Sequence, residues 1–165
     1  MKKFYIVLSI SVMVIAACQQ TPKTVSVDVE AEKAAIGVLF DKFIAAYDAG
    51  DAAALVTFLT EDGLFCGTDP SEFMNKQEIK NLFAQLFADT VPEINYIGER
   101  AIRVAADGNS ATVVLQYIMP VFSPKIPLRD VYKVVKTGDN WMIDFFSTSF
   151  IPKNEDIPKL NRAVE

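Results

Sequence analysis

The spacing of apolar residues changes once along the chain, from a helical period to a strand period. Between residues 29 and 48 apolar side chains recur every three or four positions, which predicts one amphipathic helix that ends at Gly50. The same spacing predicts a second helix that is capped by Asp51 and ends near residue 59. A third helix is predicted from Asn75 to residue 87, with Asn75 and Glu78 arranged as a capping box. The first half is therefore expected to be helical, with one short strand at residues 64–67.

Runs of alternating, β-rich sequence follow Pro92 and predict four long strands. These runs cover residues 96–106, 111–119, 129–136 and 141–150. Hairpin turns are expected around Gly108 and Gly138, because glycine tolerates the positive φ that such turns require. Residues 120–128 contain three prolines and are expected to form a loop at the sheet edge. The sheet is expected to be antiparallel.

The N-terminus has the features of a secretory signal. Lys2 and Lys3 precede an apolar run over residues 4–14, which is too short to span a bilayer. Ala16 and Ala17 stand directly before Cys18, which favours a lipoprotein signal over an ordinary signal with a chance cysteine. The predicted divisions are a signal peptide over 1–17, a lipidated tether over 18–29, a domain over 30–152 and a tail over 153–165. Lipid on Cys18 would be the membrane partner.

Lipoproteins of Gram-negative bacteria resemble this chain in their sorting residues. Gln19 follows the cysteine, whereas aspartate at that position is typical of retention in the inner membrane. The resemblance implies an outer-membrane lipoprotein that faces the periplasm.

Charge and composition exclude several classes of function. Removing the signal takes away Lys2 and Lys3 but no acidic residue, so the net charge falls from −5 to −7. A chain this acidic, with scattered basic residues, is a poor nucleic-acid binder. The absence of histidine removes the commonest general base and the commonest zinc ligand, so we expect no metal and no cofactor. With Cys18 lipidated, Cys66 is the one thiol left, and no internal disulfide can form.

Several short strings carry a resemblance to a known family. They are Gly-Thr-Asp-Pro-Ser-Glu-Phe at residues 67–73, Gln-Glu-Ile at 77–79, the strand that contains Arg129, and Trp-Met-Ile at 141–143. Over residues 34–149 the chain resembles the cone-shaped fold of nuclear transport factor 2 (NTF2-like), and within it the SnoaL-like branch. This implies an α+β fold with three N-terminal helices packed on a curved antiparallel sheet. The resemblance implies that an apolar pocket opens at the wide end of that cone.

The resemblance also implies which side chains should face that pocket. The expected pocket residues are Tyr47, Phe65, Phe73, Tyr117, Arg129, Phe145 and Ser147. The aromatic residues among them are also explained as plain core residues, because aromatic side chains supply most of the apolar area in a small domain. Arg129, if it points inward, needs an anion, which could be Asp144 or a carboxylate-bearing ligand such as a fatty acid. If it points outward, it is an ordinary surface charge. Because neighbours in a strand face opposite sides, either Asp144 or the pair Phe145 and Ser147 lines the pocket.

Three functions fit this sequence. The favoured one is binding of a small hydrophobic or amphipathic ligand, since Phe145 and Ser147 stand where SnoaL-like domains often carry histidines. The second is an isomerase or dehydratase type of enzyme, with Asp144 or Asp69 as base and Tyr47 or Tyr117 as donor. Asp69 and Glu72 are also explained as turn residues. The third is a structural homodimer, because strands 111–119 and 141–150 are apolar on both faces.

Overall fold

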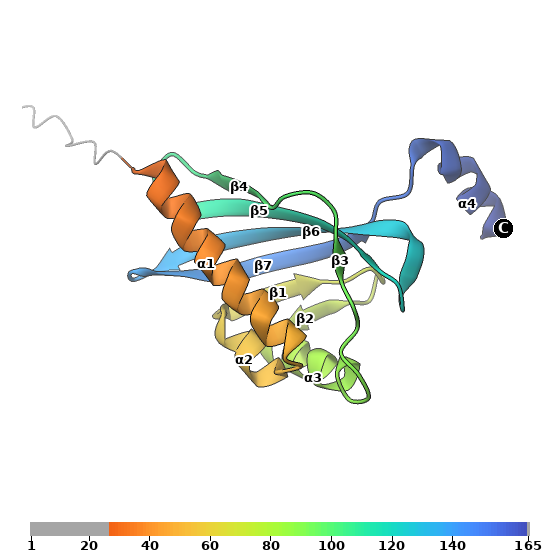
Figure 1. Cartoon of the computed structure of the whole chain (residues 1–165), viewed down its shortest axis with the longest axis horizontal. Coiled ribbons are helices and arrows are strands. Elements are labelled where there is room, and N and C mark those ends of the chain that lie inside the picture. The colour runs from red at the N-terminus through yellow and green to blue at the C-terminus, as the bar shows by residue number, and fades with distance from the viewer. Residues whose placement is uncertain (1–26, 165) are drawn as a thin grey trace, which may run out of the picture.

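The computed structural model describes residues 27–164, which form helices packed against one curved sheet (Figure 1). The predicted signal peptide, Cys18 and most of the predicted tether lie outside these residues. The helices are α1 (Val29–Asp48), α2 (Ala52–Thr57), α3 (Lys76–Leu86) and α4 (Ile157–Ala163). The strands are β1 (Leu59–Cys66), β2 (Phe73–Asn75), β3 (Asn95–Tyr96), β4 (Ala101–Val104), β5 (Ser110–Met119), β6 (Ser123–Thr137) and β7 (Asn140–Phe150).

The predicted helix starts are confirmed by their caps. The side chain of Asp51 accepts a hydrogen bond of 2.8 Å from the backbone N–H of Ala54. Asn75 and Glu78 form the complete capping box at the start of α3. The side chain of each residue accepts a hydrogen bond from the backbone N–H of the other. These local bonds satisfy amide groups that the helix itself leaves unpaired. The second helix ends earlier than predicted, because Leu59 already belongs to β1.

Within residues 27–164 the strands form one seven-stranded sheet in the order β2-β1-β7-β6-β5-β3, with β4 also paired to β5. Every neighbouring pair is antiparallel except β1 and β7, which run parallel. The antiparallel pairing expected for the long strands after Pro92 is confirmed, and the departure from an antiparallel sheet is the parallel pairing of β1 with β7. A parallel pair needs a long connection, and here α3 and the strands β2 to β6 supply it.

Two strand boundaries also differ from the sequence prediction. The strand expected over 96–106 is two short strands, β3 and β4, separated by Gly98 at a φ of 70°. The proline-rich stretch expected as a loop belongs partly to β6, which begins at Ser123. Proline lacks an N–H but keeps its carbonyl, and that of Pro127 accepts a hydrogen bond of 2.8 Å from the N–H of Ile151. The end of the sheet thus tolerates prolines.

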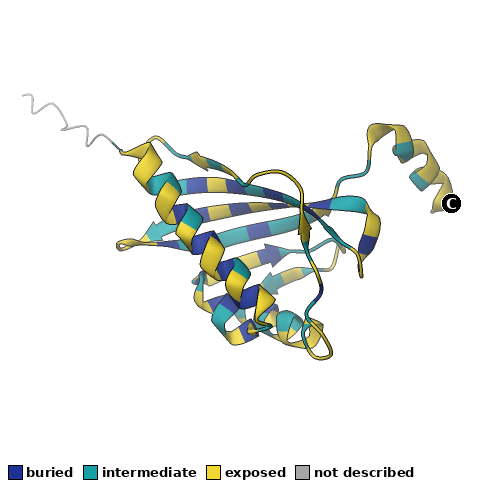
Figure 2. Cartoon of the chain, viewed as in Figure 1, coloured by how far each residue is buried: buried dark blue, intermediate teal, exposed yellow. Residues whose placement is uncertain are grey.

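The core lies between α1 and the concave face of the sheet. Phe40 and Ile36 of α1 are fully buried, and Phe40 packs edge-on against Tyr132 of β6, with 4.9 Å between the ring centroids. Figure 2 shows buried and exposed residues alternating along β5 and β6, as expected for strands with one covered face. The predicted α+β cone with helices on a curved sheet is confirmed, and the sheet stays open.

The C-terminal segment predicted as a tail contains α4. This helix projects away from the sheet, and none of its residues is buried within the described part of the chain (Figures 1 and 2). No helix among residues 27–164 combines the length and the apolar character that crossing a membrane requires.

Candidate functional site

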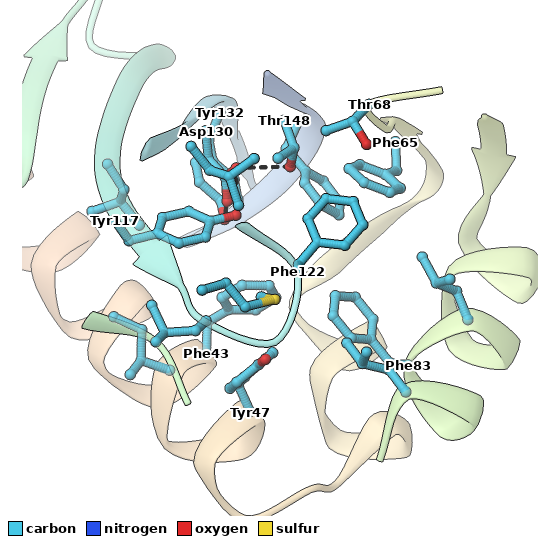
Figure 3. A pocket seen from close by; sticks show the side chains of 18 of the residues that line it. Phe43, Tyr47, Phe65, Thr68, Phe83, Tyr117, Phe122, Asp130, Tyr132 and Thr148 are labelled. Atoms are coloured by element: carbon cyan, nitrogen blue, oxygen red, sulfur yellow. Dashed lines mark hydrogen bonds between the residues drawn. The ribbon is translucent and has the colours of Figure 1, made fainter. Parts of the chain in front are cut away.

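A largely apolar cavity of about 190 Å³ lies between α1, α3 and the inner face of the sheet (Figure 3). Aliphatic residues such as Ile44, Leu82 and Leu115 form part of its wall. Most of the remainder is aromatic. The phenylalanines that line it are Phe43, Phe65, Phe83, Phe122 and Phe146, and the tyrosines are Tyr47, Tyr96, Tyr117 and Tyr132. A cavity of this size and lining suits a small ligand with an apolar body.

The polar end of the cavity is built around the carboxyl group of Asp130, on β6. Tyr117 of β5 donates a hydrogen bond of 3.0 Å to Oδ1, and Thr148 of β7 donates one of 2.7 Å to the same oxygen. Tyr132, two residues further along β6, donates one of 2.8 Å to Oδ2. Figure 3 shows the four side chains gathered on one wall, opposite Phe43 and Tyr47. Three neighbouring strands therefore direct hydroxyl groups at one buried carboxyl group.

Burial shifts the protonation of this cluster. Desolvation raises the pKa of Asp130 above its usual value, although the hydrogen bonds from Thr148, Tyr132 and Tyr117 act in the opposite direction. Desolvation and the neighbouring Asp130 raise the pKa values of Tyr117 and Tyr132, so both phenols stay protonated. Burial also raises the pKa of Tyr96 to about 12. The tyrosines can therefore act only as hydrogen-bond donors or acceptors at neutral pH.

Thr68, Glu72 and Phe122 also line the cavity, and Phe122 is 56% exposed. Glu72 is held in a tight turn, because its Oε2 accepts a hydrogen bond of 3.0 Å from the N–H of Asp69. A Cβ atom on Gly67 would collide with the carboxylate of Glu72, so glycine at that position leaves room for it. The string that carried the family resemblance therefore contributes Thr68 and Glu72 to the cavity wall.

Three of the seven expected pocket residues line the cavity. Tyr47, Phe65 and Tyr117 face it from α1, β1 and β5, and the hydroxyl of Tyr47 donates a hydrogen bond of 3.1 Å to the carbonyl of Pro92. The cavity does not include the other four. Those four are Phe73, Arg129, Phe145 and Ser147. Phe73 is 66% exposed on the edge strand β2, where it pairs with Cys66 on the outer side of the sheet.

Arg129 is exposed because side chains alternate along β6, and the next residue, Asp130, points toward the cavity. Leu128, Asp130 and Tyr132 are buried, so the residues between them face solvent. Lys133 shares the outer face with Arg129, and these two cations in the sequence indicate that this face of β6 lies outside the core. Asp130 was not predicted to face the pocket, although it alternates with the apolar residues of β6. A carboxylate at such a position is rarely buried unless it is paired.

Phe145 and Ser147 face outward because β7 contains an irregularity. Val134 pairs with Ile143, but Lys133 pairs with Phe145, so one extra residue is inserted between them. Such a bulge reverses which residues face the core. Ile143 is buried before it, and Phe146 and Thr148 face the cavity after it.

The extra residue in β7 is Asp144, which lies outside the cavity. Its Oδ2 pairs with Nζ of Lys133 at 2.7 Å, and its Oδ1 accepts a hydrogen bond of 3.3 Å from Thr60. Asp69 accepts hydrogen bonds from the N–H and the hydroxyl of Ser71, at 2.8 and 2.5 Å, as a turn residue does. Neither carboxylate proposed as a base from the sequence therefore faces the cavity, whereas Asp130 does. Residues 27–164 contain no group of three acidic, cysteine or histidine side chains placed to hold a metal ion.

Residues 36–152 match the family described as the SnoaL-like domain. No curated relative matches the chain. Among solved structures, a domain of unknown function with a cystatin-like fold from Nostoc punctiforme superposes with a TM-score of 0.64 at 21% identity, covering 80% of this chain and 85% of that one. An NTF2-like protein of unknown function from Shewanella baltica gives 0.60 at 14% identity, with coverages of 78% and 99%.

A ketosteroid isomerase-like protein from Erwinia carotovora atroseptica superposes with a TM-score of 0.58 at 18% identity, covering 74% of this chain and 98% of that one. At these identities the structural neighbours establish a shared fold. They agree with the helix and sheet arrangement described above.

Proposed function

The chain belongs to the SnoaL-like domain family, and from this premise we propose that it binds a small hydrophobic or amphipathic molecule in the cavity under the sheet. The observation that carries the proposal is the cavity itself, which is lined by aromatic and aliphatic side chains and has one polar cluster at Asp130. This combination is typical of small-molecule sites, where apolar walls supply affinity and a few polar groups fix orientation.

The size of the cavity limits the ligand. A dry protein cavity of about 150 Å³ holds a benzene molecule. The cavity of about 190 Å³ therefore has room for a single ring with a short substituent, or for a short aliphatic chain. A larger ligand would have to extend beyond the cavity.

A variant that fills the cavity tests this proposal. Leu82 lines the cavity from α3, so Leu82→Trp should occupy the space and abolish binding of a neutral single-ring compound such as 2-phenylethanol. Val38→Trp is the matched control, because Val38 is 52% exposed on α1 and lies outside the cavity. Binding is followed by saturation-transfer NMR on the full chain. Equal binding by both variants would contradict the proposed site, as would no binding to the wild type.

A second candidate function is catalysis of proton transfer next to a carbonyl group. It is favoured by the placement of Asp130, a buried carboxyl group with a raised pKa beside two protonated phenols, and by the ketosteroid isomerase-like neighbour. An enzyme of this type would exchange the α-protons of a small cyclic ketone for deuterium. Asp130→Asn would stop that exchange, and NMR in deuterated water measures it. Asp144→Asn should leave it unchanged, because Asp144 lies outside the cavity.

We also propose that this domain is held on a membrane by lipid at Cys18, on the periplasmic face of the outer membrane. The support is the order of the N-terminal residues: two lysines, an apolar run, two alanines and a cysteine. Two or three acyl chains are enough for stable anchoring, at about 0.8 kcal/mol for each buried CH₂ group. The cavity would then lie next to a bilayer from which apolar molecules can be taken.

A further inference from the structure

We propose that the cavity selects cations, and that its ligand is a small apolar molecule carrying an ammonium group. This inference rests on the proposed binding function and adds the charge of the ligand to it. The observation behind it is the combination of a buried carboxyl group at Asp130 and an aromatic wall that contains no basic side chain.

The charges around the cavity have one sign. Glu72 and Asp130 are the two charged residues of the cavity lining, all of it within residues 27–164, and both carry carboxyl groups; the lining includes no lysine or arginine. Arg129 and Lys133 are exposed on the opposite face of β6, and Lys133 is paired with Asp144. An anionic ligand would meet uncompensated repulsion here, so the fatty acid considered for an inward Arg129 does not fit.

The three hydroxyl groups around Asp130 can stabilise an ionised carboxylate. A hydroxyl group has one proton, and Tyr117, Tyr132 and Thr148 each donate theirs to this carboxylate. If Asp130 were neutral, its own proton would need an acceptor, and one of those hydroxyls would have to turn away. Neutral donors stabilise the buried anion without cancelling its charge, and a cation from the ligand would cancel it.

The carboxylate also has a lone pair left for one more donor. Oδ1 accepts two of the hydrogen bonds, from Tyr117 and Thr148, whereas Oδ2 accepts one, from Tyr132. A carboxylate oxygen has two lone pairs, so Oδ2 can receive an N–H from an ammonium group that reaches the polar end of the cavity.

The aromatic wall favours the same charge. Nine aromatic side chains line the cavity. The face of an aromatic ring is electron-rich and attracts cations, most strongly where water is excluded. A carboxylate among aromatic rings is the arrangement that recognises amines.

Three probes of one shape and different charge test this inference. 2-Phenylethylamine, 2-phenylethanol and phenylacetate share one ring and a two-carbon arm, and their affinities are measured by isothermal titration calorimetry of the full chain at pH 7. The amine should bind at least tenfold tighter than the alcohol, and phenylacetate should bind weakest. Equal affinity for amine and alcohol would overturn the inference while leaving the proposed binding function intact. Absence of binding by all three would overturn both.

Variants locate the source of the preference. Asp130→Asn keeps the shape of the side chain and removes its charge, so the preference for the amine over the alcohol should fall to less than threefold. Asp144→Asn is the control, because it removes a carboxylate outside the cavity, and it should keep the full preference. An unchanged preference in Asp130→Asn would place the selecting charge elsewhere and overturn the assignment. The comparison of the three probes on the wild type requires no variant, so it decides the inference even if Asp130→Asn does not fold.

Discussion

Asp130 and Tyr132 lie two residues apart on the inner face of β6, and the hydroxyl of Tyr132 donates a hydrogen bond of 2.8 Å to Oδ2 of Asp130. Tyr117 on β5 and Thr148 on β7 approach the same carboxyl group from either side. The cluster therefore joins three adjacent strands by side chains as well as by their backbone ladders. Its integrity affects both the stability of the sheet and the chemistry of the cavity.

The hydroxyl of Tyr132 should contribute measurably to stability. A hydrogen bond to a charged group contributes about 1.5–3 kcal/mol, compared with about 1 kcal/mol for a neutral pair. Tyr132→Phe should therefore lower the free energy of unfolding by about 2 kcal/mol at neutral pH. Tyr47→Phe is the matched control, because it removes a buried hydroxyl bonded to the neutral carbonyl of Pro92, and should cost about half as much. Urea unfolding curves measure both, and equal losses would contradict an ionised Asp130.

Titration of Asp130 should make the stability of the fold depend on pH. Its pKa in the folded protein is raised by burial, so above the unfolded value of about 3.9 the folded state holds more protons than the unfolded state. The contribution of Asp130 to the free energy of unfolding therefore falls as the pH rises from the unfolded pKa through the folded pKa. The free energy of unfolding of wild type minus that of Asp130→Asn should decline over this window.

Glu32 should show the opposite slope and serves as the control. Hydrogen bonds from Lys136 and Trp141 hold the pKa of Glu32 below its usual value. The contribution of Glu32 to the free energy of unfolding is present above its unfolded pKa of about 4.3 and is lost as the pH falls through the folded pKa. The free energy of unfolding of the wild type minus that of Glu32→Gln should therefore increase as the pH rises from the folded pKa to the unfolded pKa of Glu32. Unfolding in urea at a series of pH values measures both differences, and slopes of the same sign would refute the assignment.

The outer face of the sheet should form a homodimer. Val131 is 37% exposed on β6 and Leu64 is 38% exposed on β1, and both lie on the side of the sheet opposite the cavity. A face of this kind usually packs against a copy of itself. Light scattering of the soluble form without lipid, at micromolar concentration, should give the mass of two chains. Val131→Lys should give one chain, because it adds a third cation beside Arg129 and Lys133, whereas Val38→Lys on α1 should stay dimeric. A monomeric wild type would refute the dimer.

Membrane attachment should depend on Cys18. Serine cannot accept the diacylglyceryl group, so Cys18→Ser should leave the protein without lipid and move it from the membrane fraction to the soluble fraction. Cys66→Ser is the control, because Cys66 lies in β1 and should have no part in anchoring. Fractionation followed by immunoblotting measures both variants. If Cys18→Ser still required detergent for extraction, the lipoprotein assignment would be wrong.

The sequence by itself determined the elements whose signals are local. The stripe of α1, the caps at Asp51 and Asn75, and the hairpin glycines at 108 and 138 act within a few residues of each other, and all were predicted correctly. The family resemblance added how the elements pack, and with it the placement of Tyr47, Phe65 and Tyr117 in the cavity.

Only the tertiary structure decided which face of each strand is inside. A shift of one residue reverses every side chain on a strand, and the extra residue at Asp144 causes such a reversal in the middle of β7, where the apolar pattern continues on both sides. The parallel pairing of β1 with β7 likewise joins strands that are distant in sequence. Asp130 became the centre of the site for the same reason: the three hydroxyl groups that make its burial tolerable come together only when β5, β6 and β7 are side by side.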